Sequence, residues 1–122
     1  MAGKSTVTAE FPTVSIGGKT YELKPTLNAV RRISQAAGGI LAAYKRSSDM
    51  DIDVTATVIA AGANLTFKNQ EESDKFAKAV WQTDLQEYQS GLSEYFVLLF
   101  QGGKKAEPDD EKPKEEAKEG NA

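Results

Sequence analysis

Apolar and polar residues alternate along residues 12–24, on both sides of Gly17-Gly18. Alternation with a period of two residues is typical of a β-strand that has one buried face. Two adjacent glycines tolerate the positive φ angles that a two-residue hairpin turn requires. The pattern therefore predicts an antiparallel β-hairpin, and its buried face is expected to hold Val14, Ile16, Tyr21 and Leu23.

After Pro25 the spacing of apolar residues changes to three and four, which is the period of an α-helix. Thr26 precedes the first of these positions, and its hydroxyl can cap the first helical turn. Gly38-Gly39 then interrupts the pattern, and two glycines within one helix would cost about 2 kcal/mol relative to alanine. We therefore expect two helices separated by the glycines. The first carries Leu27, Val30, Ile33 and Ala37, and the second, shorter one carries Ile40, Leu41 and Tyr44.

The segment from Ile52 to Leu65 is compatible with two structures. Its many β-branched residues would suit a strand. However, the run from Ala60 to Asn64 is typical of a helix that passes into a C-terminal turn. We predict a helix with Asp53 as its N-terminal cap, and a strand over residues 52–60 is the alternative.

Two further helix starts are indicated by capping-box spacing, in which a small polar residue is followed by Glu or Gln three positions later. Asn69 with Glu72 opens the first of these helices. Its buried side is expected to hold Phe76 and Val80, with Trp81 as a further candidate. Thr83 with Gln86 is expected to open the last helix, which has the strongest amphipathic pattern in the chain. The apolar positions of that helix are Leu85, Tyr88, Leu92, Tyr95 or Phe96, and Leu99.

The chain changes character at Gly102, beyond which more than half of the positions are charged and none is aromatic. Such a segment cannot bury enough apolar surface to offset the entropy lost on ordering. We therefore predict a flexible N-terminus over residues 1–11, a single globular domain over residues 12–101 and a disordered acidic tail over residues 102–122. The domain is predicted to be α+β and predominantly α, with the hairpin followed by four to five helices.

The composition narrows the classes of function. The 122 residues include no cysteine and no histidine. The lack of cysteine excludes disulfides, thiolate metal sites and thiol nucleophiles. The lack of histidine removes the side chain most often used as a general base near neutral pH and the commonest transition-metal ligand. We therefore expect no enzyme, no cofactor and no metal.

The charge balance is close to neutral over residues 1–101, which hold 10 basic and 11 acidic residues. No broad basic field is present that would attract nucleic acid or anionic lipid. The compact basic clusters are Arg31-Arg32 and Lys45-Arg46, and a solvated helix face is favoured for them over a nucleic-acid contact, because no aromatic platform lies beside them.

No segment approaches the roughly 20 apolar residues that a membrane span requires. The first residues also lack the apolar run of a signal peptide. We therefore expect no membrane association and a protein that stays in the cytoplasm.

Two short motifs favour ordinary structure over ligand binding. Gly18-Lys19-Thr20 resembles the end of a phosphate-binding loop, but Thr13 occupies the position of that motif's first glycine. The alternation of Asp49, Asp51 and Asp53 resembles the start of a calcium loop. Such a loop requires glycine at its sixth position and a bidentate acid at its twelfth, where this chain has Val54 and Ala60.

Six consecutive large apolar residues, Tyr95 to Phe100, cover every side of a helix instead of one stripe. Either neighbouring parts of the chain cover the second side, or a partner does, and the sequence leaves both alternatives open. Contiguous exposed apolar patches usually mark interaction sites, and an amphipathic helix is a natural ligand for an apolar groove. The candidate partner-binding residues are Tyr88, Leu92, Tyr95, Phe96 and Leu99.

The order of these elements resembles the small tail assembly chaperones of long-tailed phages. It is most similar to the version encoded by gene transfer agents and related prophages. The resemblance covers residues 12–101 and is a pattern of small and apolar positions without an invariant chemical motif. The segments that carry it are Val14 to Leu23, Thr26 to Val30, Ala37-Gly38-Gly39, Ile40 to Tyr44, Val58 to Gly62, and Leu92 to Phe100.

The resemblance implies a non-catalytic protein that binds the long, aggregation-prone tape measure protein and keeps it soluble until tail-tube subunits polymerise around it. Such a protein acts in the host cytoplasm and is absent from the mature virion. The major tail tube protein and further copies of the chain are additional candidate partners. One alternative is a structural tail or head-completion protein retained in the virion. Another is a small nucleic-acid-binding regulator that uses Arg31, Arg32, Lys45 and Arg46.

Overall fold

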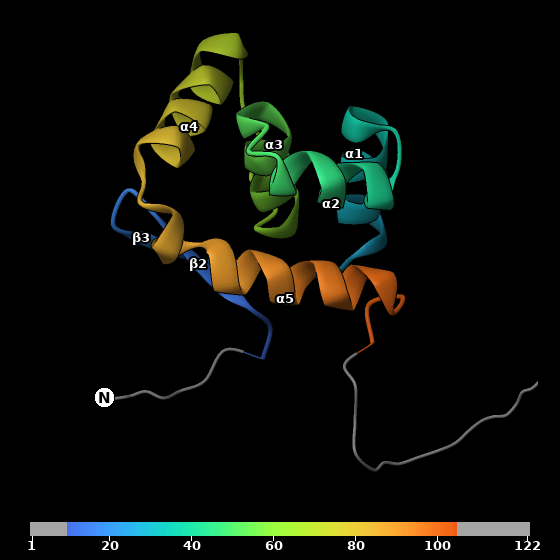
Figure 1. Ribbon diagram of the computed structural model, residues 1–122. Helices are drawn as coiled ribbons and strands as arrows, with labels where there is room; N and C mark the ends of the chain where they lie inside the picture. Colours follow the sequence, from blue (N-terminus) through green and yellow to red (C-terminus); the bar gives the residue numbers. More distant parts are fainter. Residues whose placement is uncertain (1–9, 105–122) are drawn as a thin grey trace, which may run out of the picture.

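The computed structural model describes residues 10–104 of the chain. A two-stranded β-hairpin is followed by five α-helices and one 3₁₀ helix (Figure 1), so the predicted α+β, mainly helical class is confirmed. The elements are β2 (Thr13–Ile16), β3 (Lys19–Glu22), α1 (Leu27–Ala37), α2 (Ile40–Ser48), α3 (Ile52–Gly62), α4 (Gln70–Gln82), η1 (Leu85–Glu87) and α5 (Gln89–Phe100). The flexible N-terminus predicted for residues 1–11 and the disordered tail predicted for residues 102–122 lie outside the described residues, except for residues 10–11 and 102–104. In the latter stretch the Gly103 N–H donates a hydrogen bond of 2.8 Å to the Leu98 carbonyl.

The hairpin forms as predicted, because the glycine pair supplies the left-handed backbone that its turn needs. Gly17 and Gly18 have φ angles of 61° and 82°. In the antiparallel register Val14 pairs with Tyr21, and a hydrogen bond of 2.8 Å from the Leu23 N–H to the Pro12 carbonyl extends the pairing by one residue. The face that packs against the helices carries the predicted apolar residues, of which Val14, Ile16 and Leu23 are buried and Tyr21 is half-buried.

The first two helices are separated by the glycine pair, also as predicted. The Thr26 hydroxyl accepts a hydrogen bond of 3.1 Å from the Ala29 N–H and so caps α1. Gly38 and Gly39 have φ angles of 88° and 126°, which end α1 and allow α2 to leave in a new direction. The buried stripe of α1 runs through Ala29, Ile33 and Ala37.

Leu27, one of the apolar positions that indicated this helix, does not belong to its buried face, because this side chain is 64% exposed. Leu27 is the first residue of the helix, two positions ahead of the stripe that begins at Ala29. Successive helical residues are 100° apart, so Leu27 points well away from that stripe.

The segment over residues 52–60 is helical, so the strand alternative is excluded. Helix α3 packs against α1, α2 and α4 and is buried on almost every side. Contacts with three helices thus outweigh the strand propensity of its β-branched residues. Its buried residues are Val54, Thr55, Ala56, Val58, Ile59, Ala60, Ala61 and Gly62.

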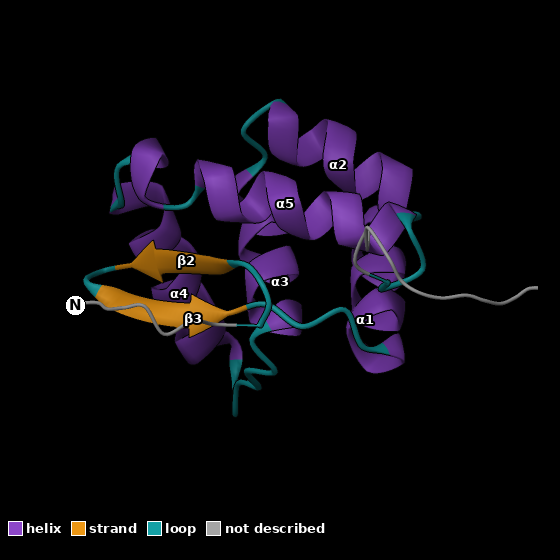
Figure 2. Cartoon of the chain, turned by 90° about the horizontal axis from the view of Figure 1, so that it is seen from below, coloured by secondary structure: helices purple, strands orange, loops and turns teal. Residues whose placement is uncertain are grey.

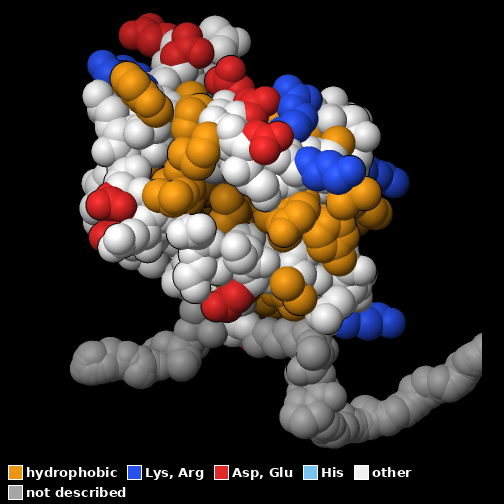
Figure 3. Space-filling view, viewed as in Figure 1, with side chains coloured by type: hydrophobic (Ala, Val, Ile, Leu, Met, Phe, Trp, Pro, Cys, Tyr) orange, Lys and Arg blue, Asp and Glu red, His pale blue; other side chains and the backbone are white. Residues whose placement is uncertain are grey.

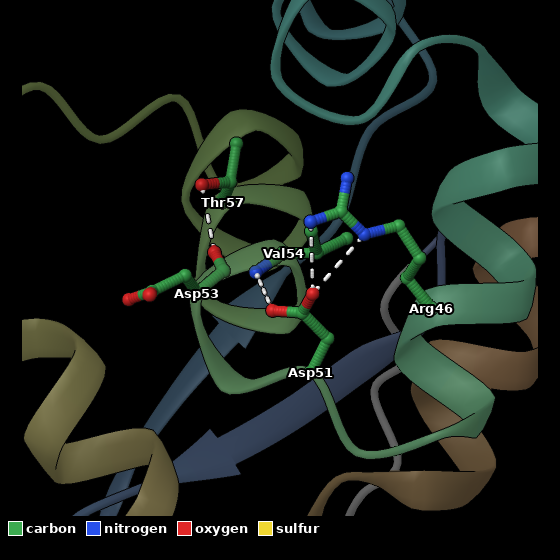
Figure 4. A network of polar contacts seen from close by, with 5 residues as sticks. All are labelled: Arg46, Asp51, Asp53, Val54 and Thr57. Atoms are coloured by element: carbon green, nitrogen blue, oxygen red, sulfur yellow. Dashed lines mark hydrogen bonds and ion pairs between the residues drawn. The ribbon is translucent and has the colours of Figure 1, made fainter.

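The N-terminal cap of α3 is Asp51, and the prediction of Asp53 is wrong (Figure 4). The Asp51 Oδ1 atom accepts a hydrogen bond of 3.1 Å from the Val54 N–H. Asp53 already lies within the first turn, where its backbone carbonyl accepts a hydrogen bond from the Thr57 hydroxyl. The helix begins two residues earlier than the position that the sequence pattern indicated.

Helix α4 begins as predicted, with the Asn69 side chain accepting a hydrogen bond of 3.0 Å from the Glu72 N–H. Val80 is buried and Phe76 is half-buried. Trp81 is 67% exposed, so it does not belong to the buried side of the helix. It lies next to the buried Val80, and the rotation of 100° between neighbouring helical residues turns it toward solvent.

The predicted capping box of Thr83 and Gln86 does not form. The Thr83 hydroxyl donates a hydrogen bond of 2.7 Å to the Ala79 carbonyl and so turns back onto the end of α4. Its oxygen also accepts a hydrogen bond of 3.0 Å from the Gly17 N–H. Asp84 takes over the capping role and accepts from the Gln86 N–H, but it starts only the short helix η1. The last helix therefore begins at Gln89, five residues later than a cap at Thr83 would place it.

Helix α5 is the element that joins the hairpin to the helices. It runs across the molecule between α2 and β2 (Figure 2) and packs against both of them. The approach to β2 is so close that a Cβ atom built on Gly91 would lie 1.9 Å from the Thr13 carbonyl oxygen. Glycine at position 91 is thus required for the strand and the last helix to meet.

Candidate functional site

All five residues predicted to bind a partner are buried in this structure, and none of them is more than 8% exposed. Helix α5 turns them toward the hairpin and the other helices. Of the two alternatives that the sequence left open, the structure therefore favours the central helix covered by the chain's own neighbours. Most of an accessible contact surface has to come from other residues, although Tyr88, Leu92 and Phe96 line a hollow at the surface.

Tyr95 of α5 is fully buried in the core of the protein. Its phenol oxygen donates a hydrogen bond of 2.8 Å to the Lys24 carbonyl, and its ring lies against Gly62 of α3. Burial raises the pKa of the Tyr95 phenol far above its ordinary value, and the nearby positive charge of Arg32 offsets this rise only in part. The phenol therefore stays protonated and keeps its role as a hydrogen-bond donor.

Five of the eight large apolar residues that are exposed within residues 10–104 gather on a different surface, which α2, η1 and α5 form together. Figure 3 shows hydrophobic side chains collected over α2 and α5. We define the apolar face by five residues that are between 38% and 55% exposed: Leu41, Tyr44, Met50, Leu85 and Phe100. The Tyr44 ring makes edge-to-face contacts with Phe96 and Phe100, at centroid distances of 5.4 and 5.8 Å, and so links α2 to α5.

A hollow lies in the apolar face, where the end of α2 meets η1 and the start of α5. Its volume is about 110 Å³. Large apolar side chains form part of its wall, and hydroxyl and amide groups form the rest. The lining residues are Tyr44, Ser47, Ser48, Met50, Leu85, Tyr88, Gln89, Leu92, Ser93 and Phe96.

Met50 stands at the edge of this hollow in an unusual backbone conformation. Its φ angle is 66°, in the left-handed region that disfavours side chains with a Cβ atom. At the same time its apolar side chain is 48% exposed. Strained residues persist where the surrounding structure holds them and are concentrated at functional sites. The turn that ends α2 holds Met50 in this way: Met50 follows the C-cap Asp49, and the Asp51 N–H donates a hydrogen bond of 2.9 Å to the Arg46 carbonyl.

The four basic residues considered for nucleic-acid binding do not form one free positive surface. The Arg46 guanidinium makes an ion pair of 3.0 Å with Asp51, and its Nε atom donates a second hydrogen bond to the same carboxylate. The Nη1 atom of Arg32 is buried and lines a recess between α1, α3 and α4. Arg31 and Lys45 are exposed.

Of the aspartates considered for calcium binding, Asp51 and Asp53 lie at the start of α3, whereas Asp49 lies at the C-terminal end of α2. Both carboxylate oxygens of Asp51 are engaged, one by the Val54 N–H and the other by Arg46 (Figure 4). The hydrogen bond from Val54 lowers the pKa of the Asp51 carboxyl, and Arg46 lowers it further, against a smaller opposing effect of burial. Within residues 10–104 no group of three or more His, Cys, Asp or Glu residues has the arrangement of a metal site.

The phosphate-loop alternative for Gly18-Lys19-Thr20 is excluded by the local structure. Gly18 lies in the hairpin turn, and Lys19 and Thr20 belong to β3. A phosphate-binding loop requires a helix directly after the threonine, so that backbone N–H groups point at the ligand.

The apolar face was not predicted from the sequence, although one signal for it was present. On α2 the buried residues are Ala43 and Ser47, which are small, whereas Leu41 and Tyr44 are large and exposed. The sequence of α2 has the ordinary helical period whether its small or its large apolar side chains face the core. Only the tertiary packing shows which side is which.

Comparisons with known proteins were made at three levels. The chain matches no protein-family model, no curated protein and no solved structure. In the part of the chain that the structure describes, none of the helices has the length and apolar character needed to cross a bilayer.

Proposed function

We propose that this protein is a phage tail assembly chaperone that binds apolar helical segments of the tape measure protein and keeps them soluble until the tail tube assembles. The proposal combines the family resemblance of residues 12–101 with the chemistry of the apolar face. In this role the protein is non-catalytic, acts in the host cytoplasm and is absent from the mature virion. The major tail tube protein is a further candidate partner.

The observation that carries the proposal is the orientation of α2. Its core side holds the small residues Ala43 and Ser47 together with the half-buried Ile40, and its outer side presents Leu41 and Tyr44. A helix that served only to cover the core would gain stability by burying the large residues, since each buried Leu or Phe side chain contributes about 1.5–3 kcal/mol. Exposed aromatic and aliphatic residues around a hollow are typical of a surface that a partner covers.

An α-helix is the partner element that best fits this surface. The apolar face follows α5, whose 12 residues span roughly 18 Å at 1.5 Å per residue. That length matches about three turns of a second helix laid alongside. Helices docked in apolar grooves present anchors at positions i, i+3 or i+4, and i+7. Tyr44 and Phe100 would contact such anchors from the two sides of the face.

Two observations weigh against the nucleic-acid regulator. Arg46 is already paired with Asp51, and one guanidinium nitrogen of Arg32 is buried. Binding to a phosphate backbone depends on free cations that can displace counterions. Because two of its four candidate arginine and lysine side chains are engaged in this way, this protein should pass through a nucleic-acid column at low salt.

Co-expression with the tape measure protein of the same genome tests the proposal. We expect the tape measure protein to be soluble when the wild-type chain is present and insoluble when it is absent. Leu41→Ser and Phe100→Ser replace exposed residues of the apolar face and should abolish the effect. Trp81→Ser is the matched control, because Trp81 is the most exposed large apolar residue within residues 10–104 and lies on α4, outside the face.

Equal insolubility of the tape measure protein with and without the wild-type chain would reject the proposed function. If all three variants lost solubilisation alike, the effect would depend on the total exposed apolar surface and not on the apolar face. Mass spectrometry of purified particles separates the chaperone from a structural protein, since a chaperone should be missing from them. Finding the chain in stoichiometric amount would favour the tail or head-completion alternative.

A further inference from the structure

Ser47 carries a hydroxyl group that the described fold does not use. The residue is 9% exposed, and its Oγ atom is shielded from solvent and has no hydrogen-bond partner within residues 10–104. Buried polar groups almost always find a partner, because an unsatisfied one incurs its full desolvation penalty. An alanine at this position would fill nearly the same space without that penalty.

The position of Ser47 relates this hydroxyl to the apolar face. Ser47 is one of the residues that line the hollow between α2, η1 and α5. At about 110 Å³ the hollow is several times larger than the roughly 10–15 Å³ that a single water molecule needs. It therefore has room for part of a side chain. The Oγ atom is shielded in the rotamer that the structure shows, so rotation about the single χ1 bond of Ser47 to another staggered position would have to turn the hydroxyl toward such a group.

The wall of the hollow restricts which side chain can enter. None of the ten lining residues carries a formal charge. A charged group placed there would lose its hydration without meeting an opposite charge, which is strongly unfavourable. Burial raises the pKa of the Tyr88 phenol, so this wall residue also stays neutral. A purely aliphatic side chain would match Tyr44, Leu85 and Leu92 but would leave the Ser47 hydroxyl unpaired.

We infer that the hollow seats one uncharged side chain with a hydrogen-bonding end, of the glutamine, asparagine or threonine type, from the middle of the bound helix, and that Ser47 selects it. This inference rests on the proposed docking of a helix along the apolar face. It adds a specificity-determining residue to that surface: Leu41, Tyr44 and Phe100 provide apolar contact, and Ser47 fixes which residue of the partner lies over the hollow. Polar groups in an otherwise apolar site discriminate by leaving wrong ligands with unpaired groups.

Selection from a displayed library of amphipathic helical peptides tests the inference even when the natural partner has not been isolated. The library has a fixed polar side, apolar residues at the outer positions of the other side, and a fully randomised position at its centre. It is selected in parallel against the wild-type chain, Ser47→Ala and Ser48→Ala. Ser48 is the matched control, because it is the next residue, lines the same hollow and is exposed.

We expect the wild-type chain and Ser48→Ala to enrich Gln, Asn or Thr at the central position. Ser47→Ala should enrich Leu, Met or Phe there. It should bind the peptide that the wild-type chain enriches most about tenfold more weakly than the wild-type chain does, which corresponds to about 1.4 kcal/mol. Ser47→Ala should also unfold at the same or a higher temperature than the wild-type chain, because the substitution removes an unpartnered buried hydroxyl. A lower unfolding temperature would show that the hydroxyl serves the fold and would overturn the inference.

The outcomes separate the two proposals. Enrichment of apolar residues by all three proteins, or of charged residues by any of them, would overturn the role of Ser47 and leave the apolar face as a docking surface. Failure to enrich any helical peptide would overturn the docking of a helix at this face and the inference with it. The solubility of the co-expressed tape measure protein would then decide independently whether the proposed function survives with a different surface.

Discussion

The phenol of Tyr95 donates a hydrogen bond to the backbone carbonyl of Lys24, a residue 71 positions earlier in the chain. The N–H group of Lys24 in turn donates a hydrogen bond of 2.8 Å to the carbonyl of Gly62. Lys24, at the end of the hairpin, is thus hydrogen-bonded to both α5 and α3. This arrangement explains why Tyr95 is part of the core and is not available to a partner.

Replacement of Tyr95 by phenylalanine should destabilise the fold. The ring would still fill its site, but the Lys24 carbonyl would lose one of its two donors and keep only the Thr26 N–H, so we expect a loss of about 1 kcal/mol. Urea denaturation followed by circular dichroism measures the difference. An unchanged midpoint would mean that water replaces the phenol and that the hydrogen bond contributes little.

The stability of the protein should fall as the pH rises above about 10. The folded state raises the pKa of the Tyr95 phenol from its ordinary value of 10.0, because burial disfavours the phenolate. A group whose pKa is raised by folding contributes its stabilisation below the unfolded pKa and loses it at higher pH. In an ultraviolet absorbance titration, part of the phenolate signal should appear only together with unfolding. Tyr95→Phe should reduce that late component.

Gly91→Ala should disrupt the contact between α5 and β2. The added methyl group would overlap the Thr13 carbonyl oxygen, which is backbone and cannot rotate away. We expect a loss of about 3 kcal/mol or more, at the upper end of what overpacking costs. Ser90→Ala, at the neighbouring exposed position of the same helix, is the control and should change the unfolding midpoint little. Equal effects of the two variants would show that α5 can shift to relieve the overlap.

Asp51→Ala should destabilise the protein by about 1 kcal/mol at neutral pH through loss of the cap on α3. Asp51→Asn should cost less, since asparagine also caps helices and only the ion pair with Arg46 is lost. The pKa of the Asp51 carboxyl lies below its ordinary value of 3.8 in the folded state, so the ionised form stabilises the fold at higher pH. That contribution is lost as the pH falls through the folded pKa.

The stability gap between the wild-type chain and Asp51→Ala should therefore narrow below about pH 4. Urea denaturation of both proteins at pH 7 and pH 3 measures it. A gap of the same size at both values would assign the effect to packing and not to the charge of the carboxylate.

Met50→Gly should increase stability and weaken partner binding at the same time. Glycine adopts the φ angle of 66° at position 50 without the strain of a side chain, which is worth about 1 kcal/mol. The same change removes an exposed apolar group from the edge of the hollow. Thermal unfolding and pull-down of the tape measure protein measure the two effects. A Met50→Gly protein that is more stable and binds equally well would remove Met50 from the apolar face.

The parts of the fold that sequence predicted correctly depend on local chemistry. Gly17-Gly18 and Gly38-Gly39 adopt positive φ angles that few other residues tolerate, and Thr26 and Asn69 cap the helices that follow them. The capping prediction failed at Thr83 because its hydroxyl bonds backward to Ala79 and the adjacent Asp84 supplies a competing acceptor. Where two adjacent residues, here Thr83 and Asp84, can both accept a capping hydrogen bond, the sequence alone does not show which of them starts the helix.

The candidate site was harder to predict because it depends on which side of each helix meets the rest of the chain. The run from Tyr95 to Phe100 in α5 is apolar on all sides, so its sequence could not distinguish a covered helix from a docking surface. On α2 the small residues Ala43 and Ser47 face inward. Hydrophobicity alone would have placed Leu41 and Tyr44 there. Position within the tertiary structure, and not residue type, defines the apolar face.

The close seating of α5 against β2 has a consequence for biosynthesis. The hairpin is among the first parts of the folded body to leave the ribosome, whereas the helix that packs on it is the last of the helices described. Contacts between distant parts of a chain form late, because the intervening segment must first be brought together. The nascent protein therefore cannot close its core until translation of the domain is nearly finished. Any chain that terminates early would expose the hairpin's apolar side and become a target for degradation.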